Sequence, residues 1–223
     1  MVFLFPCLLE ASRDNSMGSE KKKGTITKDR IFQAAMAVFA RHPYQAASMR
    51  MIGQEGEFDH PLINYYFPTK AILFEAVTES ICRKVYASNL EWYAGLQGQS
   101  LKKAFPLYLD RLIEHHKEHP EIFRILALNL AQADSVSDIP GYSYFLELLE
   151  LHARTFTNTL KPSCSNEDVI IFTSSFNSLV INFLGSEGTH AGMLSLEPGS
   201  DAYYEWVKKS LVYLFLPRLR EML

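Results

Sequence analysis

Cysteine is scarce in this sequence, which argues against a disulfide-stabilised secreted fold. The three residues Cys7, Cys82 and Cys164 lie far apart, their number is odd, and none belongs to a C-x-x-C pair. Small secreted domains instead carry even numbers of closely spaced cysteines. We therefore expect a protein of the reducing cytoplasm.

Membrane and catalytic signatures are also missing. The apolar start, residues 2–9, is too short to span a bilayer and lacks the basic segment of a signal peptide. There is no glycine-rich phosphate loop, no nucleophile elbow and no paired carboxylate with an obvious role. We therefore expect no membrane partner, no enzymatic activity and no cofactor.

Three histidines near the middle of the chain are the candidates for metal ligands. His115 and His119 are spaced i, i+4 and would share one helix face, but the second position of the zinc-protease pattern holds His116 rather than glutamate. Charged neighbours indicate a solvated helix end, where a cationic histidine also suits the helix dipole. The sequence therefore predicts no metal site.

Apolar residues recur at helical spacing through nearly all of the chain, and no stretch shows the alternation of a strand. The composition, 48% hydrophobic and 21% charged, is typical of a soluble globular protein. We predict an all-α fold of about nine helices, in which Pro106 kinks one helix or moves its start. The helices are expected at about 28–41, 49–55, from 60 onward, 70–92, from 101 onward, 120–133, 142–160, 166–185 and 200–216.

Charge and periodicity divide the chain into three parts. Residues 1–24 are predicted to be a disordered arm, 25–70 a three-helix head, and 71–223 a helical body. Residues 17–70 hold 8 Lys and Arg against 5 Asp and Glu, whereas 71–223 hold 13 against 18. A modestly basic head on an acidic body is what a phosphate-binding module on a sensor would show.

Two short helices joined by a tight turn predict a helix-turn-helix in the head. Thr27 is a possible cap for the first head helix. Ser48 is placed to cap the second, and Gly56 to end it. Asp59 is placed to cap the third, in which Pro61 is tolerated because the first turn needs no backbone donor there.

Residues 62–74, LINYYFPTKAILF, resemble the end of the helix-turn-helix in the tetracycline-repressor (TetR) family of bacterial transcription regulators, and the resemblance covers about 27–74. It implies an N-terminal DNA-binding domain and a C-terminal domain for ligand binding and dimerisation. The expected function is a homodimeric repressor that binds a palindromic double-stranded DNA operator and is released by a small-molecule effector. Two alternatives remain: a relative that has lost operator recognition, and an all-helical enzyme or ligand carrier.

The resemblance also implies which residues meet DNA, with base contacts from the first turn of the third helix and backbone contacts around it. The predicted DNA-binding residues are Ser48, Arg50, His60, Pro61, Leu62, Asn64, Tyr65, Tyr66 and Lys70. Either tyrosine could pack inward instead, and the run 21–23 could be a solvated tail rather than a minor-groove reader. The family usually has glycine where this chain has Glu57 and serine or threonine where it has Asp59, so two carboxylates lie near the expected DNA.

The body offers candidates for effector binding and for dimerisation. Polar residues on apolar stripes need buried partners, which are either a ligand or internal hydrogen bonds. The candidate effector residues are Tyr108, Asn129, His152 and Asn177. By the resemblance, the last two long helices pair with a second subunit, although an internal pair of core helices is the alternative. The candidate dimer residues are Phe176, Val180, Phe183, Val207, Leu211 and Leu214.

Overall fold

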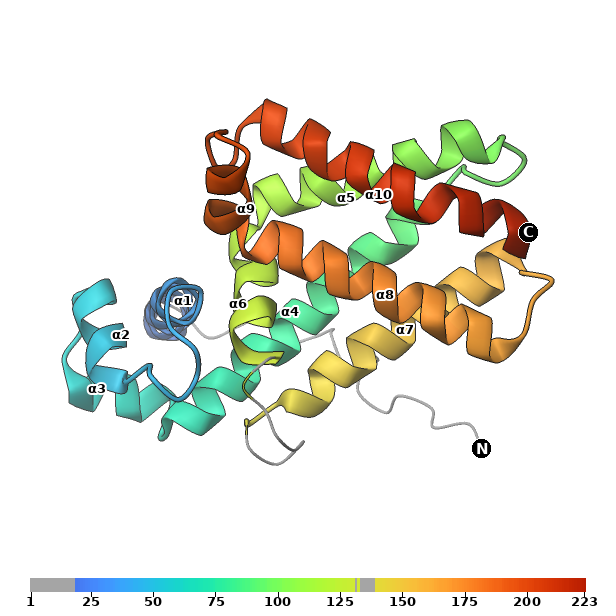
Figure 1. Cartoon of the computed structure of the whole chain (residues 1–223). Coiled ribbons are helices and arrows are strands. Elements are labelled where there is room, and N and C mark those ends of the chain that lie inside the picture. The colour runs from blue at the N-terminus through green and yellow to red at the C-terminus, as the bar shows by residue number, and fades with distance from the viewer. Residues whose placement is uncertain (1–18, 131, 133–138) are drawn as a thin grey trace.

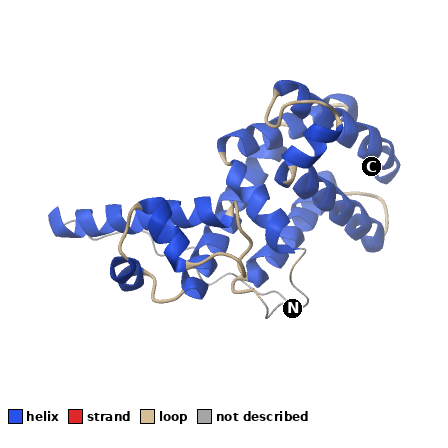
Figure 2. Ribbon diagram, turned by 60° about the vertical axis from the view of Figure 1, so that its left-hand side comes forward, coloured by secondary structure: helices blue, strands red, loops and turns tan. Residues whose placement is uncertain are grey.

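The structure is a computed structural model that describes residues 19–130, 132 and 139–223. Within these ranges the chain forms ten α-helices and no strand (Figure 2), which confirms the all-α prediction. The helices are α1 (Ser19–Phe39), α2 (Met49–Gly56), α3 (His60–Tyr66), α4 (Lys70–Tyr93), α5 (Leu101–Glu118), α6 (Pro120–Leu130), α7 (Tyr142–Leu160), α8 (Asn166–Gly185), α9 (Glu187–Met193) and α10 (Asp201–Met222).

The first helix begins earlier than predicted. Its backbone is helical from Ser19, so the predicted disordered arm is wrong for 19–24, and its first 18 residues lie outside the described part. Thr27 is an internal residue of α1 rather than its cap. The start of α1 contains Glu and three Lys, which have high helix propensity, and this compensates for the cost of Gly24.

The head consists of α1, α2 and α3 and is built onto the start of α4 (Figure 1). Apolar side chains from all three helices form its core, where Ile31, Ala35, Phe39, Ile52 and Ile63 have no exposed surface. The Phe39 ring meets the Phe74 ring of α4 edge-on, with centroids 4.7 Å apart. Because α4 continues into the body, the head and the body share one rigid element.

In the body, α8 is the central helix and packs against α6, α7 and α10, while α5 pairs with α10 and α4 with α7. By length and composition alone, α8 could cross a membrane, but 44% of its apolar window is buried inside the fold. Packing against other helices of the same chain therefore explains part of its apolar character, whereas Ile170 and Ile171 are exposed. The body also differs from prediction: α9 was missed, α6 ends at Leu130, and α10 runs past Pro217 to Met222.

A glycine allows α6 and α8 to approach closely. A Cβ atom at Gly185 would lie 2.5 Å from the carbonyl oxygen of Phe123 and 2.5 Å from the Cβ of Ala127, both on α6. The Gly185 carbonyl accepts a hydrogen bond of 2.7 Å from Nη1 of Arg124. This contact fixes α6, which also reaches the head.

Candidate functional site

The helix-turn-helix is closed by local hydrogen bonds at both ends of α2. The Ser48 hydroxyl accepts a hydrogen bond of 3.3 Å from the Met51 N–H, as the cap prediction requires. At the other end the left-handed residue is Glu57, with φ 57° and ψ 45°, rather than Gly56. Gly56 cannot be replaced easily either, because a Cβ there would lie 2.4 Å from the Phe58 ring. The tight turn therefore places a non-glycine residue in a conformation that favours glycine.

The third helix begins without the side-chain cap that we predicted. Asp59 occupies the N-cap position with extended backbone, but its carboxylate makes no capping hydrogen bond. Pro61 lies in the first turn, as expected. The Asp59 side chain is exposed, so its negative charge lies beside the surface of α3.

The surface of α3 is formed by the residues that the sequence had singled out. His60, Pro61, Leu62 and Tyr65 are exposed, whereas Ile63 is buried in the head core. Nδ1 of His60 lies 3.1 Å from Nδ2 of Asn64, which links the two along one face.

The two adjacent tyrosines differ. Tyr65 is 80% exposed, and its ring meets that of Tyr66 edge-on at 5.1 Å. Tyr66 is half-buried against the core. Of the two, Tyr65 is the free aromatic side chain.

Lys70 has a structural role that the sequence did not reveal. Its Nζ donates hydrogen bonds to the carbonyl oxygens of Tyr44, at 2.8 Å, and Ala47, at 2.9 Å. The ammonium also lies 4.3 Å from the centre of the Tyr44 ring, and burial lowers the pKa of Lys70. Lys70 thus ties the loop between α1 and α2 to the start of α4. Arg50, by contrast, is exposed.

Asn129 connects the head to the body and lies apart from the other candidate effector residues. Its Oδ1 accepts a hydrogen bond of 2.8 Å from the Tyr44 N–H, and its Nδ2 donates one of 2.8 Å to the Ile125 carbonyl. The side chain is fully buried. Both ends of the amide are satisfied by backbone groups, so the structure assigns this residue a structural contact in place of the effector contact that we predicted.

The other three candidates meet in the body, together with a residue that sequence reasoning missed. Nε2 of His152 lies 3.2 Å from the hydroxyls of both Tyr93 and Tyr108, and its Nδ1 lies 2.6 Å from Oδ1 of Asn177. Because Oδ1 is an acceptor, Nδ1 carries the proton and Nε2 accepts from a tyrosine hydroxyl. Tyr93 follows Trp92 at the end of α4, where the helical pattern offered no signal to select it.

Burial dominates the electrostatics of this cluster. It lowers the pKa of His152 to about 4, against the opposing effect of the hydrogen bond that His152 donates to Asn177, so the imidazole is neutral at pH 7. Burial likewise raises the pKa values of Tyr93 and Tyr108. The cluster is therefore uncharged and offers hydroxyl and imidazole groups for hydrogen bonding.

A cavity of about 260 Å³ adjoins this cluster. Its lining comes from α4, α5, α7, α8 and α10 and from the connection between α4 and α5. Apolar side chains supply most of the lining, among them Leu101, Phe105, Phe156, Phe172, Phe176 and Leu219. Tyr93, Tyr108 and His152 form one polar wall. Three more polar residues, Gln97, Gln99 and Thr159, also line the cavity, and none of the described lining side chains carries a charge at pH 7.

Most of the predicted dimer residues are wrong as surface contacts, because they are buried inside the single chain. The exposed fractions are Phe176 2%, Val180 3%, Phe183 8%, Val207 0% and Leu211 0%, whereas Leu214 is 49% exposed. A helical stripe of apolar residues looks the same in sequence whether it faces its own core or a partner. The exposed apolar residues of α8 and α10 are Ile170, Ile171, Tyr213 and Leu214.

The end of α5 is solvated only in part, because Glu114, Lys117 and Glu118 are exposed as predicted but two of the three histidines are buried. His115 is 8% exposed and His116 is 1% exposed. Nε2 of His116 lies 2.8 Å from Oε1 of Glu187, which joins α5 to α9. Tertiary packing at this helix end overrides the expectation from its charged neighbours.

The fold and this geometry define a helix-turn-helix protein whose three-helix head is built onto a helical body with a cavity. Residues 31–77 match the model of the bacterial regulatory proteins of the tetR family. Two solved structures share the fold. A TetR transcriptional regulator from Legionella pneumophila has TM-score 0.61 and 20% identity, covering 85% of this chain and 97% of that one. A tetR-family transcriptional regulator from Streptomyces coelicolor has TM-score 0.58 and 17% identity, covering 92% and 86%.

A curated protein with a related sequence is also a transcription regulator by name. The HTH-type transcriptional repressor SCO4008 of Streptomyces coelicolor is 34% identical over 100 residues. The match spans 45% of this chain and 47% of that repressor, which is less than half of either protein. The match to the tetR-family model is thus confined to residues 31–77, whereas the fold shared with the two solved tetR-family regulators extends over most of the chain.

Proposed function

We propose that this protein is a DNA-binding transcription regulator of the cytoplasm, acting as a repressor. The observation that carries the proposal is the surface of α3, where His60, Pro61, Leu62 and Tyr65 are exposed on a helix held by a helix-turn-helix. Side chains in such a position reach base edges in the major groove, while flanking groups contact phosphates. The relative named as a transcriptional repressor supports the same direction of control.

The charge distribution supports binding to the DNA backbone. The head is modestly basic and the body acidic. Arg50 is exposed near α3, and Ser48 begins α2 at a helix N-terminus that favours phosphate. Lys70 can contribute to phosphate binding only if it leaves its two carbonyl partners, so we assign it to positioning the head.

The body cavity is the proposed effector site, and its chemistry narrows the ligand. An uncharged, mainly apolar molecule with one hydrogen-bonding group suits the apolar walls and the Tyr93, Tyr108 and His152 cluster. The lining side chains offer no counter-charge to a carboxylate or an ammonium group. An effector of this kind would release DNA by binding one arrangement of the heads more tightly than the other.

Binding to a palindromic operator requires two heads, so we propose a homodimer. The exposed apolar residues of α8 and α10, Ile170, Ile171, Tyr213 and Leu214, form the proposed dimer face. The symmetric pairing of this face would present the two heads to two half-sites.

Fluorescence anisotropy with labelled DNA from upstream of the protein's own gene tests the proposal. We expect the native protein to bind this DNA at least tenfold more tightly than a scrambled duplex, with affinity falling by a log–log salt slope of about −0.9 per phosphate contact. Tyr65→Ala should weaken binding at least tenfold, because it removes an exposed side chain of α3 that the proposal places against DNA. The core packing of the head is unchanged.

Met193→Ala is the matched control, since Met193 is also 80% exposed but lies on α9 of the body. Equal binding of the native protein to operator and scrambled DNA would refute operator recognition. That result is what the carboxylates of Glu57 and Asp59 would produce in a relative that keeps the fold but no longer reads DNA.

A further inference from the structure

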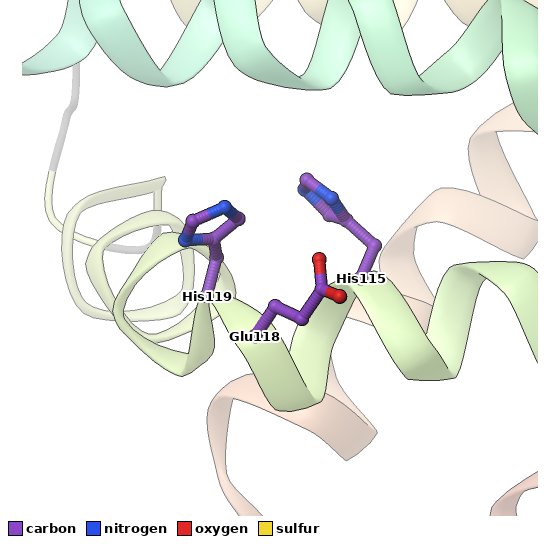
Figure 3. Close-up of side chains that lie close together, drawn as sticks. All are labelled: His115, Glu118 and His119. Carbon is purple, nitrogen blue, oxygen red and sulfur yellow. The ribbon is translucent and has the colours of Figure 1, made fainter.

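Three side chains at the end of α5 form a cluster that the proposed regulatory function does not use. His115, Glu118 and His119 each offer one ligand atom, and these atoms all lie within 4.8 Å of one another (Figure 3). The two imidazole rings are 5.2 Å apart between centroids. Because His115 and His119 are one helical turn apart, they project from the same side of α5.

His115 is buried with part of its hydrogen-bonding capacity unused. Its Nδ1 lies 3.2 Å from the Ser88 hydroxyl of α4, whereas its Nε2 has no hydrogen-bond partner in the described structure. A buried polar atom without a partner is costly, and it requires an explanation. A bound cation is one such explanation, because a neutral imidazole nitrogen donates its lone pair to a metal.

Acidic side chains lie near the cluster and would balance the charge of a bound cation. Nδ1 of His119 lies 3.6 Å from Oε1 of Glu121. Glu91 and Glu114 line the same surface depression as His115 and Glu118.

Arg111 lines this depression too, but its Nη1 donates to the carbonyl oxygens of Glu91, Trp92 and Ala94, at 2.7–3.2 Å. The guanidinium is thus held at the end of α4. Metal-binding histidines usually donate their second ring N–H to an outer acceptor, and the Ser88 hydroxyl is placed to accept such a bond from Nδ1 of His115.

We propose that His115, Glu118 and His119 bind one divalent transition-metal ion of the zinc class. Two imidazoles and one carboxylate form a ligand set that zinc, cobalt and nickel favour, whereas calcium and magnesium prefer oxygen ligands alone. Tetrahedral zinc with bonds of about 2.0–2.1 Å needs ligand atoms about 3.4 Å apart. Closing from the present spacing of up to 4.8 Å would require rotation of the exposed Glu118 and the half-buried His119, neither of which is held in the core.

This proposal reverses the expectation from sequence, which considered only the position directly after His115 for a glutamate. Glu118 lies three residues after His115 and one before His119, and it is this carboxylate that the helix brings to the two rings. The ion would sit where α5 ends at Glu118 and α6 begins at Pro120. It would therefore stabilise the bend between these helices.

Calorimetric titration of tag-free, chelator-treated protein with zinc chloride tests the proposal, with a phosphine reductant present to keep the cysteines reduced. We expect one ion per chain, and we expect cobalt chloride to give the visible absorption of tetrahedral coordination. His119→Ala and Glu118→Gln should each weaken zinc binding at least tenfold. Neither side chain is buried, so both variants should fold, and thermal unfolding without metal checks this.

The matched controls are His42→Ala, a half-buried histidine of the head, and Glu150→Gln, an exposed glutamate on α7. Both should bind zinc like the native protein. Absence of zinc uptake would overturn the proposal, as would native-like binding by His119→Ala or an equal loss in His42→Ala. These titrations need no DNA, so their outcome is separate from that of the operator experiment.

Discussion

At the scale of single residues, His152 shows how burial sets protonation in the body. Its ring is enclosed by Tyr93, Tyr108 and Asn177, and burial lowers its pKa from 6.5 to about 4. In the unfolded chain the same imidazole would titrate near its ordinary value. Between these two values the unfolded state binds a proton that the folded state does not bind, so folding stability must rise with pH across this window.

We predict that the free energy of unfolding falls as pH is lowered from 7.5 to 5, and falls less in His152→Gln. Below the unfolded pKa the contribution of His152 approaches a slope of about 1.4 kcal/mol per pH unit, whereas glutamine does not titrate. Urea denaturation followed by tryptophan fluorescence measures both curves. Parallel curves for the two proteins would show that folding does not lower the pKa of His152.

The residues of the candidate site could be predicted only where local pattern determined their place. The exposed positions of α3 follow from a short amphipathic helix, so His60, Leu62 and Tyr65 could be chosen from sequence. The roles of Lys70 and Asn129 could not, because each makes its contact with backbone groups distant in the chain. Tyr93 was missed for the same reason, since its partner His152 lies 59 residues away.

At the scale of elements, most helices with regular apolar spacing or clear end signals were predicted well, whereas the short, glycine-containing α9 was not. The bounds of α7 and α8 agree with the predicted ranges. Helix α9 has seven residues, two of them Gly188 and Gly192, so neither propensity nor periodicity marks it. Its place is determined by contact with α8 and by the Glu187 interaction with His116.

The crossing of α6 and α8 gives a prediction about element packing. Gly185→Ala should lower the free energy of unfolding by about 1–3 kcal/mol, because its methyl group would overlap the Phe123 carbonyl and the Ala127 side chain. Thermal or urea unfolding measures the change. Gly192→Ala on α9 is the matched control, since a Cβ there meets nothing within 4 Å and alanine favours a helix. A Gly185→Ala variant as stable as the control would contradict this packing.

At the scale of the whole molecule, the resemblance to a family predicted which helices form a dimer interface, but it did not show which residues of those helices face the partner. The apolar residues that were chosen on α8 and α10 fill the interior of one chain, with the exception of Leu214. The opposite sides of α8 and α10 carry the exposed Ile171 and Tyr213 instead. Only the three-dimensional packing distinguishes these two sides, since both helices contain apolar residues on more than one face.

We predict that Ile171→Glu and Tyr213→Glu each convert the proposed dimer to a monomer at micromolar concentration. A charge placed in a desolvated apolar interface has no partner there, so association loses free energy while the fold of each chain is unchanged. Sedimentation velocity measures the mass. Leu90→Glu serves as the control, because Leu90 is 54% exposed on α4 outside the proposed face. A monomeric native protein, or dimeric variants, would refute the assignment of this face.

The hydrogen bond between Asn129 and Tyr44 has a consequence for how this protein can diverge. Its donor on the head is a main-chain N–H, which every amino acid except proline possesses. Substitution of Tyr44 can therefore change the aromatic contact with Phe74 while the hydrogen bond between the head and the body is retained. Position 129 tolerates less change, because its side chain must both accept the bond from Tyr44 and donate one to the Ile125 carbonyl.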